Sequence, residues 1–143
     1  MAKFVKTDAN GNKASIESFG DLKVVETITA NRTLRVEDSG KVFLIATDAL
    51  TITLPSTVAG LDYTFINTGA AGNNIITISP QATDGICGTI TLASSVVTRV
   101  GTVDTDLVNT KATSTKGNSV RIIGTGVAGT GAYNIVSSTG IWA

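Results

Sequence analysis

The stretch Leu50-Thr51-Ile52-Thr53-Leu54-Pro55 decides the fold class of this chain. Successive side chains of a β-strand point to opposite faces, so the stretch places Leu50, Ile52 and Leu54 on one face and the threonines on the other. Pro55 ends the strand because proline has no N–H to donate to a neighbouring strand. The pattern predicts a strand with one face buried and one face near solvent.

Similar short runs rich in Val, Ile and Thr recur on both sides of this stretch, separated by Gly, Asn and Asp. They predict further strands at 24–29, 33–36, 41–45, 63–67, 75–78, 86–92, 96–103, 119–123 and 133–137. Helix-forming residues never cluster at helical spacing. The sequence therefore predicts an all-β fold, a single-domain β-sandwich or barrel-like module of about nine or ten short strands that spans residues 21–143.

The remaining segments are predicted as connections. Residues 1–20 are expected to form an N-terminal arm or hairpin, since Asn10-Gly11 is a type I′ turn signal. Turns are expected at 37–40 and at Asp84-Gly85, a bend at Gly88, irregular structure with one helical turn around Leu107 at 104–117, and a glycine-rich connector at 124–131.

The composition is poor in charge and balanced in sign. Only 15% of the residues are charged, against about 25% in typical soluble domains, and 11 basic residues match 11 acidic ones. Threonine, at about one residue in six, is expected to cover much of the surface, or else some surface is hidden against other chains. The absence of a Lys/Arg block argues against nucleic acid as a partner.

No apolar run approaches the roughly 18 residues of a membrane helix, and the first twenty residues have no apolar core of signal-peptide length. The chain is therefore expected to have no membrane partner, and to stay in the cytosol unless it leaves as part of a particle.

Residues suited to enzyme chemistry are few. Histidine is absent and cysteine occurs once, which excludes His-dependent triads, a Cys cluster for zinc and an intrachain disulfide. Cys87 lies in an apolar run without a basic neighbour, so it is predicted to be a buried small hydrophobe. Asp84, Asp104 and Asp106 are the carboxylates considered for glycoside cleavage, but nothing in the sequence brings them together.

Two glycine-containing motifs resemble ligand sites only superficially. The run Gly124-Thr125-Gly126-Val127-Ala128-Gly129 fits G-x-G-x-x-G, yet it leads into a strand where a dinucleotide site needs a helix. The string Asp8-x-Asn10-Gly11-Asn12 lacks the acid of a calcium loop, because Phe19 stands at the twelfth position. No catalytic residue, metal or cofactor is therefore expected, and the chain is not predicted to be an enzyme.

The aromatic residues are sparse, at 5% of the chain. Tyr63 and Phe65 share one face of a predicted strand and fit a core role. Trp142 lies next to the last residue, where an aromatic side chain either docks into its own domain or is buried against a partner. Both alternatives stay open.

Residues 50–143 carry a resemblance to small virion proteins of tailed bacteriophages. It rests on Thr51–Pro55, Gly60–Gly69, Ile75–Pro80 with Asp84-Gly85-Ile86, and the ending Tyr133-Asn134-Ile135-Val136-Ser137-Ser138-Thr139-Gly140-Ile141-Trp142-Ala143. The chain most resembles the head decoration (cement) proteins, although related patterns also occur in tail fibres and appendages.

The resemblance implies a structural protein without catalytic residues, which binds the outside of a phage capsid as a homotrimer. Its partners would be further copies of itself and the major capsid protein, and its location the capsid surface of the virion after synthesis in the host cytoplasm. The candidate residues for capsid contact are Phe4, Val5, Ile16 and Phe19 in the arm, because an extended arm can add a strand to a neighbouring sheet. The candidate subunit-interface residues are Tyr133, Ile141 and Trp142.

Three alternatives remain at this stage: a tail-fibre or appendage domain that binds host surface glycans, an enzyme on a β scaffold, and a free-standing binding module. The low aromatic content argues against the first, since sugar stacking needs exposed rings. The missing histidine and scattered acids argue against the second.

Overall fold

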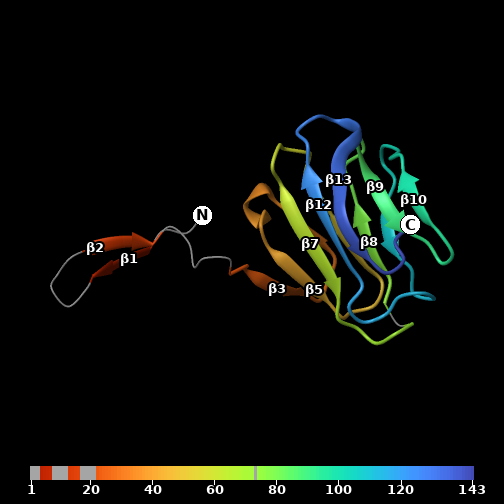
Figure 1. The fold of residues 1–143 in the computed structure, drawn as a ribbon, viewed down its shortest axis with the longest axis horizontal. Helices are drawn as coiled ribbons and strands as arrows, with labels where there is room; N and C mark the ends of the chain where they lie inside the picture. Colours follow the sequence, from red (N-terminus) through yellow and green to blue (C-terminus); the bar gives the residue numbers. More distant parts are fainter. Residues whose placement is uncertain (1–3, 8–12, 17–21, 73) are drawn as a thin grey trace.

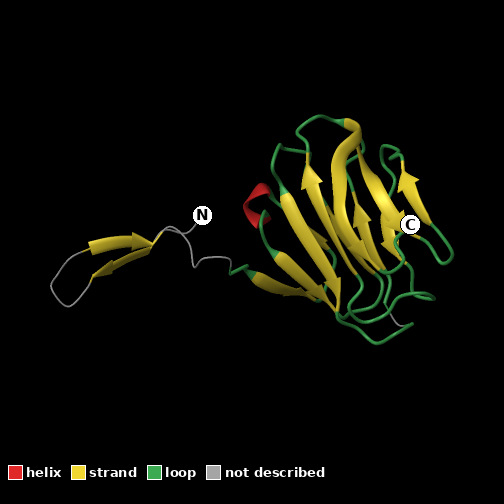
Figure 2. Ribbon diagram, in the orientation of Figure 1, coloured by secondary structure: helices red, strands yellow, loops and turns green. Residues whose placement is uncertain are grey.

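The computed structural model describes residues 22–72 and 74–143 in full, and residues 4–7 and 13–16 as backbone strands. Strands and loops make up nearly all of the described chain, with one short turn of 3₁₀ helix (Figure 2). The fold is all-β, as the sequence predicts, and it is a sandwich of two mixed sheets.

The larger sheet has seven strands, which lie side by side in the order β10-β9-β13-β12-β7-β5-β3 (Figure 1). Their bounds are β3 Val25–Ile28, β5 Val42–Ile45, β7 Asp62–Asn67, β9 Asp84–Thr91, β10 Val96–Arg99, β12 Ser119–Gly124 and β13 Gly129–Thr139. The smaller sheet has four strands in the order β11-β8-β6-β4. Their bounds are β4 Arg32–Thr33, β6 Leu50–Thr53, β8 Ile76–Ser79 and β11 Leu107–Asn109. The sandwich thus has slightly more strands than expected.

From β3 to β9 the chain alternates between the two sheets with every strand. Strands that follow one another within a sheet therefore run in the same direction, and β3–β5, β5–β7, β4–β6 and β6–β8 are parallel pairs. This winding leaves β3 and β4 as edge strands of their sheets. A parallel pair needs a long crossover, and here the intervening strand of the opposite sheet supplies it.

The core lies between the sheets and follows the alternation in the sequence. Ile52 and Leu54 are fully buried whereas Thr51 and Thr53 are only half-buried, which confirms the predicted faces of this strand. Tyr63 and Phe65 are also fully buried, and the Phe65 ring stacks on Phe43 with centroids 5.6 Å apart. Each such side chain contributes roughly 1.5–3 kcal/mol by its removal from water.

Two predicted local structures are wrong. The predicted strand at 33–36 is instead β4 followed by a 3₁₀ turn, η1 (Val36–Asp38). The Asp38 carboxylate accepts the Arg35 backbone N–H at 3.0 Å, which favours a turn over extension. The helical turn expected around Leu107 is the strand β11, which pairs with β8 and buries Leu107.

Glycines also decide the conformation at three places near β9 and β10, and two of these differ from the predicted strand and turn. The strand predicted to reach Val103 ends at Arg99, because Gly101 takes φ +71° and the Thr130 carbonyl occupies the space of a side chain. Asp84-Gly85 is not a turn but begins β9, the turn being closed by Asp84 N–H to the Gln81 carbonyl. Gly88 has φ +133° and makes room for Ile135, in agreement with an irregularity at this position.

In the N-terminal segment, for which the sequence leaves an arm or a hairpin open, the structure describes one strand pair. Strands β1 (Phe4–Thr7) and β2 (Lys13–Ile16) are antiparallel, with Phe4 opposite Ile16 and Thr7 opposite Lys13. The Asn10-Gly11 turn lies outside the described residues, as do Phe19 and the Asp8-x-Asn10-Gly11-Asn12 string.

Candidate functional site

Four charged side chains form a closed ring at the corner where β3, β4 and β5 meet. Arg32 and Lys41 each contact both Glu26 and Asp38. The Arg32–Asp38 distance is 3.0 Å, and Lys41 Nζ lies 2.7 Å from Asp38 and 3.1 Å from Glu26. We call these four residues the charged ring. Each charge has two partners of opposite sign, so the ring is neutral.

Backbone and aromatic contacts hold the charged ring in place. The Asp38 side chain is 9% exposed, and its second oxygen accepts the Arg35 N–H. The Tyr63 hydroxyl donates to the Arg35 carbonyl at 2.8 Å. The Arg32 guanidinium carbon lies 5.6 Å from the centroid of Phe43, a cation–π geometry that also covers the core. The ring therefore closes this corner of the sandwich with charges where hydrophobic side chains would otherwise be needed.

The electrostatics of this corner keep Asp38 ionised and Tyr63 neutral. Burial by itself raises the pKa of the Asp38 carboxyl, but hydrogen bonds from Lys41 and the Arg35 N–H, with the Arg32 charge, outweigh it and the pKa is lowered. Burial, together with the charges of Asp38 and Glu37, raises the pKa of Tyr63 to about 12. Neither group titrates near neutral pH, so neither suits general acid–base catalysis.

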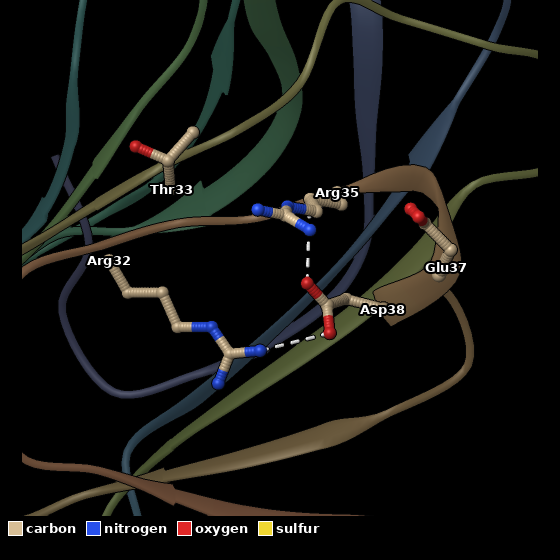
Figure 3. Close-up of a pocket in the computed structure, with 5 residues that line it drawn as sticks. All are labelled: Arg32, Thr33, Arg35, Glu37 and Asp38. Carbon is tan, nitrogen blue, oxygen red and sulfur yellow. Dashed lines mark hydrogen bonds and ion pairs between the residues drawn. The ribbon is translucent and has the colours of Figure 1, made fainter.

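A pocket of about 340 Å³ opens beside the charged ring (Figure 3). Its lining combines two cations with two anions and one hydroxyl, from Arg32, Thr33, Arg35, Glu37 and Asp38. Arg32 and Asp38 are already paired with each other, and the remaining lining charges, Arg35 and Glu37, are of opposite sign, so the lining has no net charge. Within the described part of the chain, no group of three His, Cys, Asp or Glu side chains is placed to hold a metal ion.

A chain of four buried asparagines lies at another part of the sandwich. Asn74 donates to Asn67 at 3.0 Å, Asn67 donates to Asn109 at 3.0 Å, and Asn109 donates to Asn118 at 3.2 Å. Asn109 also donates to the Ile141 carbonyl, and Asn118 accepts the Thr115 N–H. The asparagine chain ties the loops after β7 and β11 to the C-terminal segment, a structural role that satisfies buried polar groups.

The carboxylates considered for catalysis do not form a catalytic pair. Asp84 is 1% exposed and accepts the Thr57 N–H at 2.8 Å, so it fixes a loop. Asp104 contacts Asp84 through the backbone, because its N–H donates to the Asp84 carbonyl. The side chains of Asp104 and Asp106 lie among exposed residues. Asp84 is thus a structural carboxylate.

The other motifs also have structural explanations. The glycine-rich run from Gly124 joins β12 to β13 and opens no helix. Cys87 is half-buried, not buried as predicted, because it points outward from β9 and contacts Asn134 at 2.8 Å. Outward residues on a sheet face keep partial exposure even when they are apolar.

The residues predicted to form a subunit interface are largely inside the chain's own core. Tyr133 and Trp142 are fully buried, and their polar atoms donate to the Pro55 and Thr139 carbonyls. Burial and the nearby Tyr63 and Asp84 raise the pKa of Tyr133. In this fold, neither side chain presents a surface to another subunit. Of the two alternatives for Trp142, the structure shows docking into its own domain. Ile141 is half-buried and pairs with Thr91 in a β-bridge.

The residues predicted to contact the capsid are only partly described. Phe4, Val5 and Ile16 lie in the β1–β2 strand pair, of which the structure describes the backbone alone, and Phe19 lies outside the described residues. The capsid contact therefore remains a prediction.

The face of the larger sheet that points away from the core is unusually apolar on β3, β5 and β7. Val25 is 57% exposed, while Val42, Leu44 and Ile66 are half-buried and alternate with core residues. Val25 is paired with Val42, and Leu44 with Ile66. We call these four residues the apolar corner. Sequence analysis could have found it, since Val42–Ile45 is a continuous apolar run.

Comparisons with protein-family models, with curated proteins and with solved structures find no match to this chain. In the part of the chain that the structure describes, no helix has the length and apolar character to cross a membrane.

Proposed function

We propose that this chain is a structural virion protein, which binds the outside of a tailed-phage capsid as a homotrimer and stabilises the head. The observation that carries the proposal is the apolar corner on β3, β5 and β7 of the seven-stranded sheet. Beside it the charges of Asp62 and Arg121 pair with each other, and the polar clusters of the sandwich serve its own fold. Broad contact with other chains suits such a face better than small-molecule chemistry does. The sequence resemblance to head decoration proteins gives the proposal its biological setting.

The partners in this proposal are further copies of the chain and the major capsid protein. The N-terminal arm engages the capsid, since a strand pair with open edges can pair with a sheet edge of another protein. Several weak contacts per trimer then act together, because each later contact forms at high effective concentration once the first has formed.

The alternative of a glycan-binding tail-fibre domain has less support. All five aromatic side chains that the structure describes, those of Phe43, Tyr63, Phe65, Tyr133 and Trp142, are fully buried. A sugar therefore finds no stacking ring among the described residues.

The proposal is tested with heads of the phage that encodes the chain, stripped of this protein. Full-length protein should sediment as a compact species of about three times 14.6 kDa and should bind the heads. A variant without residues 1–20 should keep its unfolding temperature and lose head binding. Undiminished binding by this variant would remove the arm from the proposal, and failure of the full-length protein to bind heads would refute the function itself.

A further inference from the structure

The apolar corner has no partner among the described residues. Its four side chains point away from the core, because the alternate residues Phe43, Ile45 and Phe65 are buried between the sheets. They form one continuous patch, since cross-strand pairs join Val25 to Val42 and Leu44 to Ile66. A patch of this kind on a sheet face is typical of a surface that another chain covers.

Strand β5 itself has the pattern of a strand covered on both faces. Its four residues are Val42, Phe43, Leu44 and Ile45, an unbroken apolar run. Strands with one wet face alternate apolar and polar residues, whereas unbroken runs mark strands buried on both sides. The core accounts for Phe43 and Ile45, and a second cover would account for Val42 and Leu44, which are half-buried in the chain alone.

The apolar corner continues onto an open edge. β3 is the last strand of the seven-stranded sheet, and the residues before it, Leu22 and Val24, are 78% and 63% exposed. Proteins usually protect such edges with charges, prolines or bulges. Here Lys23 supplies one charge beside these apolar side chains. The outer face of the sheet and the adjoining β3 edge together form one apolar surface.

The charges on this face favour a second copy of the chain as the occupant. On β3, β5, β7 and β12 the outward charged side chains are Asp62 and Arg121, which pair through two hydrogen bonds of 3.0 and 2.8 Å. The sheet face is thus neutral by internal pairing and does not repel its own copy, and Lys23 is the one further charge at the β3 edge. The face also offers no field that would select an oppositely charged partner.

The order in which contacts form also favours a second copy as the occupant, an argument that rests on the proposed function. A protein that is made free and then added to a finished head carries its head-binding surface exposed in water beforehand, so that surface should be polar. Interfaces between permanently associated subunits are the more hydrophobic ones. We therefore propose that the apolar corner, with the β3 edge, is the interface between copies of this chain in the homo-oligomer.

The size of a stable interface is compatible with this corner. A standard interface takes about 800 Å² from each partner, about a tenth of the 7679 Å² exposed by the chain. Four residues do not fill that area, so the contact extends to the threonines beside them, Thr27 and Thr64. The four apolar side chains form its water-excluded centre, which carries most of the binding energy.

The test compares two lysine substitutions in the apolar corner with one elsewhere. Val25→Lys changes an exposed side chain on the edge strand, at one end of the patch. Ile66→Lys changes a half-buried side chain on β7, at the other end. Val127→Lys is the matched control, because Val127 is 70% exposed in the β12–β13 loop. Sedimentation velocity over a range of concentrations gives the oligomeric state, and circular dichroism with fluorescence of Trp142 reports folding. Val25→Lys keeps the test decisive if Ile66→Lys does not fold.

The wild type and Val127→Lys should form the same oligomer, while folded Val25→Lys should need at least about tenfold more protein to associate. If folded corner variants associate like the wild type, the interface lies elsewhere and the inference is wrong, although the proposed trimer and head binding stand. If Val25→Lys stays oligomeric but loses head binding, the corner belongs to the capsid contact and the inference is equally wrong. A monomeric wild type refutes both the inference and the trimer, while the separate head-binding assay still decides the virion role.

Discussion

Asp38 is the residue on which the charged ring depends. Its carboxylate contacts Arg32, Lys41 and the backbone N–H of Arg35, just before η1, from a site that is almost closed to water. Surface ion pairs usually contribute little, because solvent screens them and their side chains lose entropy. Asp38 differs from them because it is buried and held on both oxygens. Glu37, the next residue along, is exposed and shares the same 3₁₀ turn, so it is a natural control.

Replacement of Asp38 by Asn should lower the free energy of unfolding by about 2 kcal/mol, because Arg32 and Lys41 each lose a buried partner. Glu37→Gln removes the same charge and should change stability by less than about 0.5 kcal/mol. Urea unfolding of the three proteins measures both values. Equal losses for the two variants would show that net charge matters at this corner and the ring geometry does not.

The same substitution should change how stability depends on acid. The folded-state pKa of Asp38 lies below its ordinary value of 3.8, so the unfolded chain takes up the proton first as the pH falls. The contribution of Asp38 is therefore complete above about pH 4 and is lost as the pH falls further. Asp38→Asn should flatten this acid-induced loss. Some dependence should remain, because a hydrogen bond from Lys111 also lowers the pKa of Asp48. An unchanged acid profile for Asp38→Asn would contradict the assignment.

Strands could be predicted where alternation alone decides them, as in β6 and β7. Prediction failed where contacts distant in the sequence decide the conformation. β11 is a strand because β8 pairs with it. At η1 the reason is local instead, since the Asp38 carboxylate accepts the N–H of Arg35, three residues before it. The charged ring and the asparagine chain could not be predicted either, since their members are spread over many residues with no fixed spacing. The continuous apolar run of β5, by contrast, can be recognised in the sequence alone.

The asparagine chain sets a steric limit on the segment that follows β13. Gly140 has φ +86°, and a Cβ there would lie 2.2 Å from the Asn118 Nδ2 atom. Asn118 cannot move without loss of its bonds to Asn109 and Thr115. Gly40 has the same φ of +86°, and a Cβ there would meet nothing within 4 Å, so it is the control for the backbone conformation.

Gly40→Ala should therefore cost about 1 kcal/mol, the backbone penalty of a left-handed conformation. Gly140→Ala should cost at least about 2 kcal/mol more, because the asparagine chain must also be disrupted. Free energies of unfolding from urea titrations at neutral pH test the difference. Similar losses at both positions would mean that the loop after β11 adjusts freely and that the asparagine chain is not rigid.

The two ends of the chain play different parts in the stability of the sandwich. The C-terminal segment joins both sheets, since Ile141 bridges to Thr91 of β9 and Ala143 exchanges backbone hydrogen bonds of 2.7 and 3.0 Å with Val108 of β11. Trp142, between them, is fully buried. At the other end, the first core residue in the described part of the chain is Ile28.

Deletion of residues 142–143 should consequently cost about 3–5 kcal/mol or more, a large part of the 5–15 kcal/mol that stabilises a typical domain. Trp142→Phe keeps an aromatic ring but loses the bond to the Thr139 carbonyl, and should fall between the deletion and the wild type. Deletion of residues 1–20 should leave the unfolding temperature unchanged. Differential scanning calorimetry of the four proteins ranks them. If the short C-terminal deletion melted with the wild type, Trp142 would not be part of the folded core in solution, and a role for it between subunits would become the better explanation.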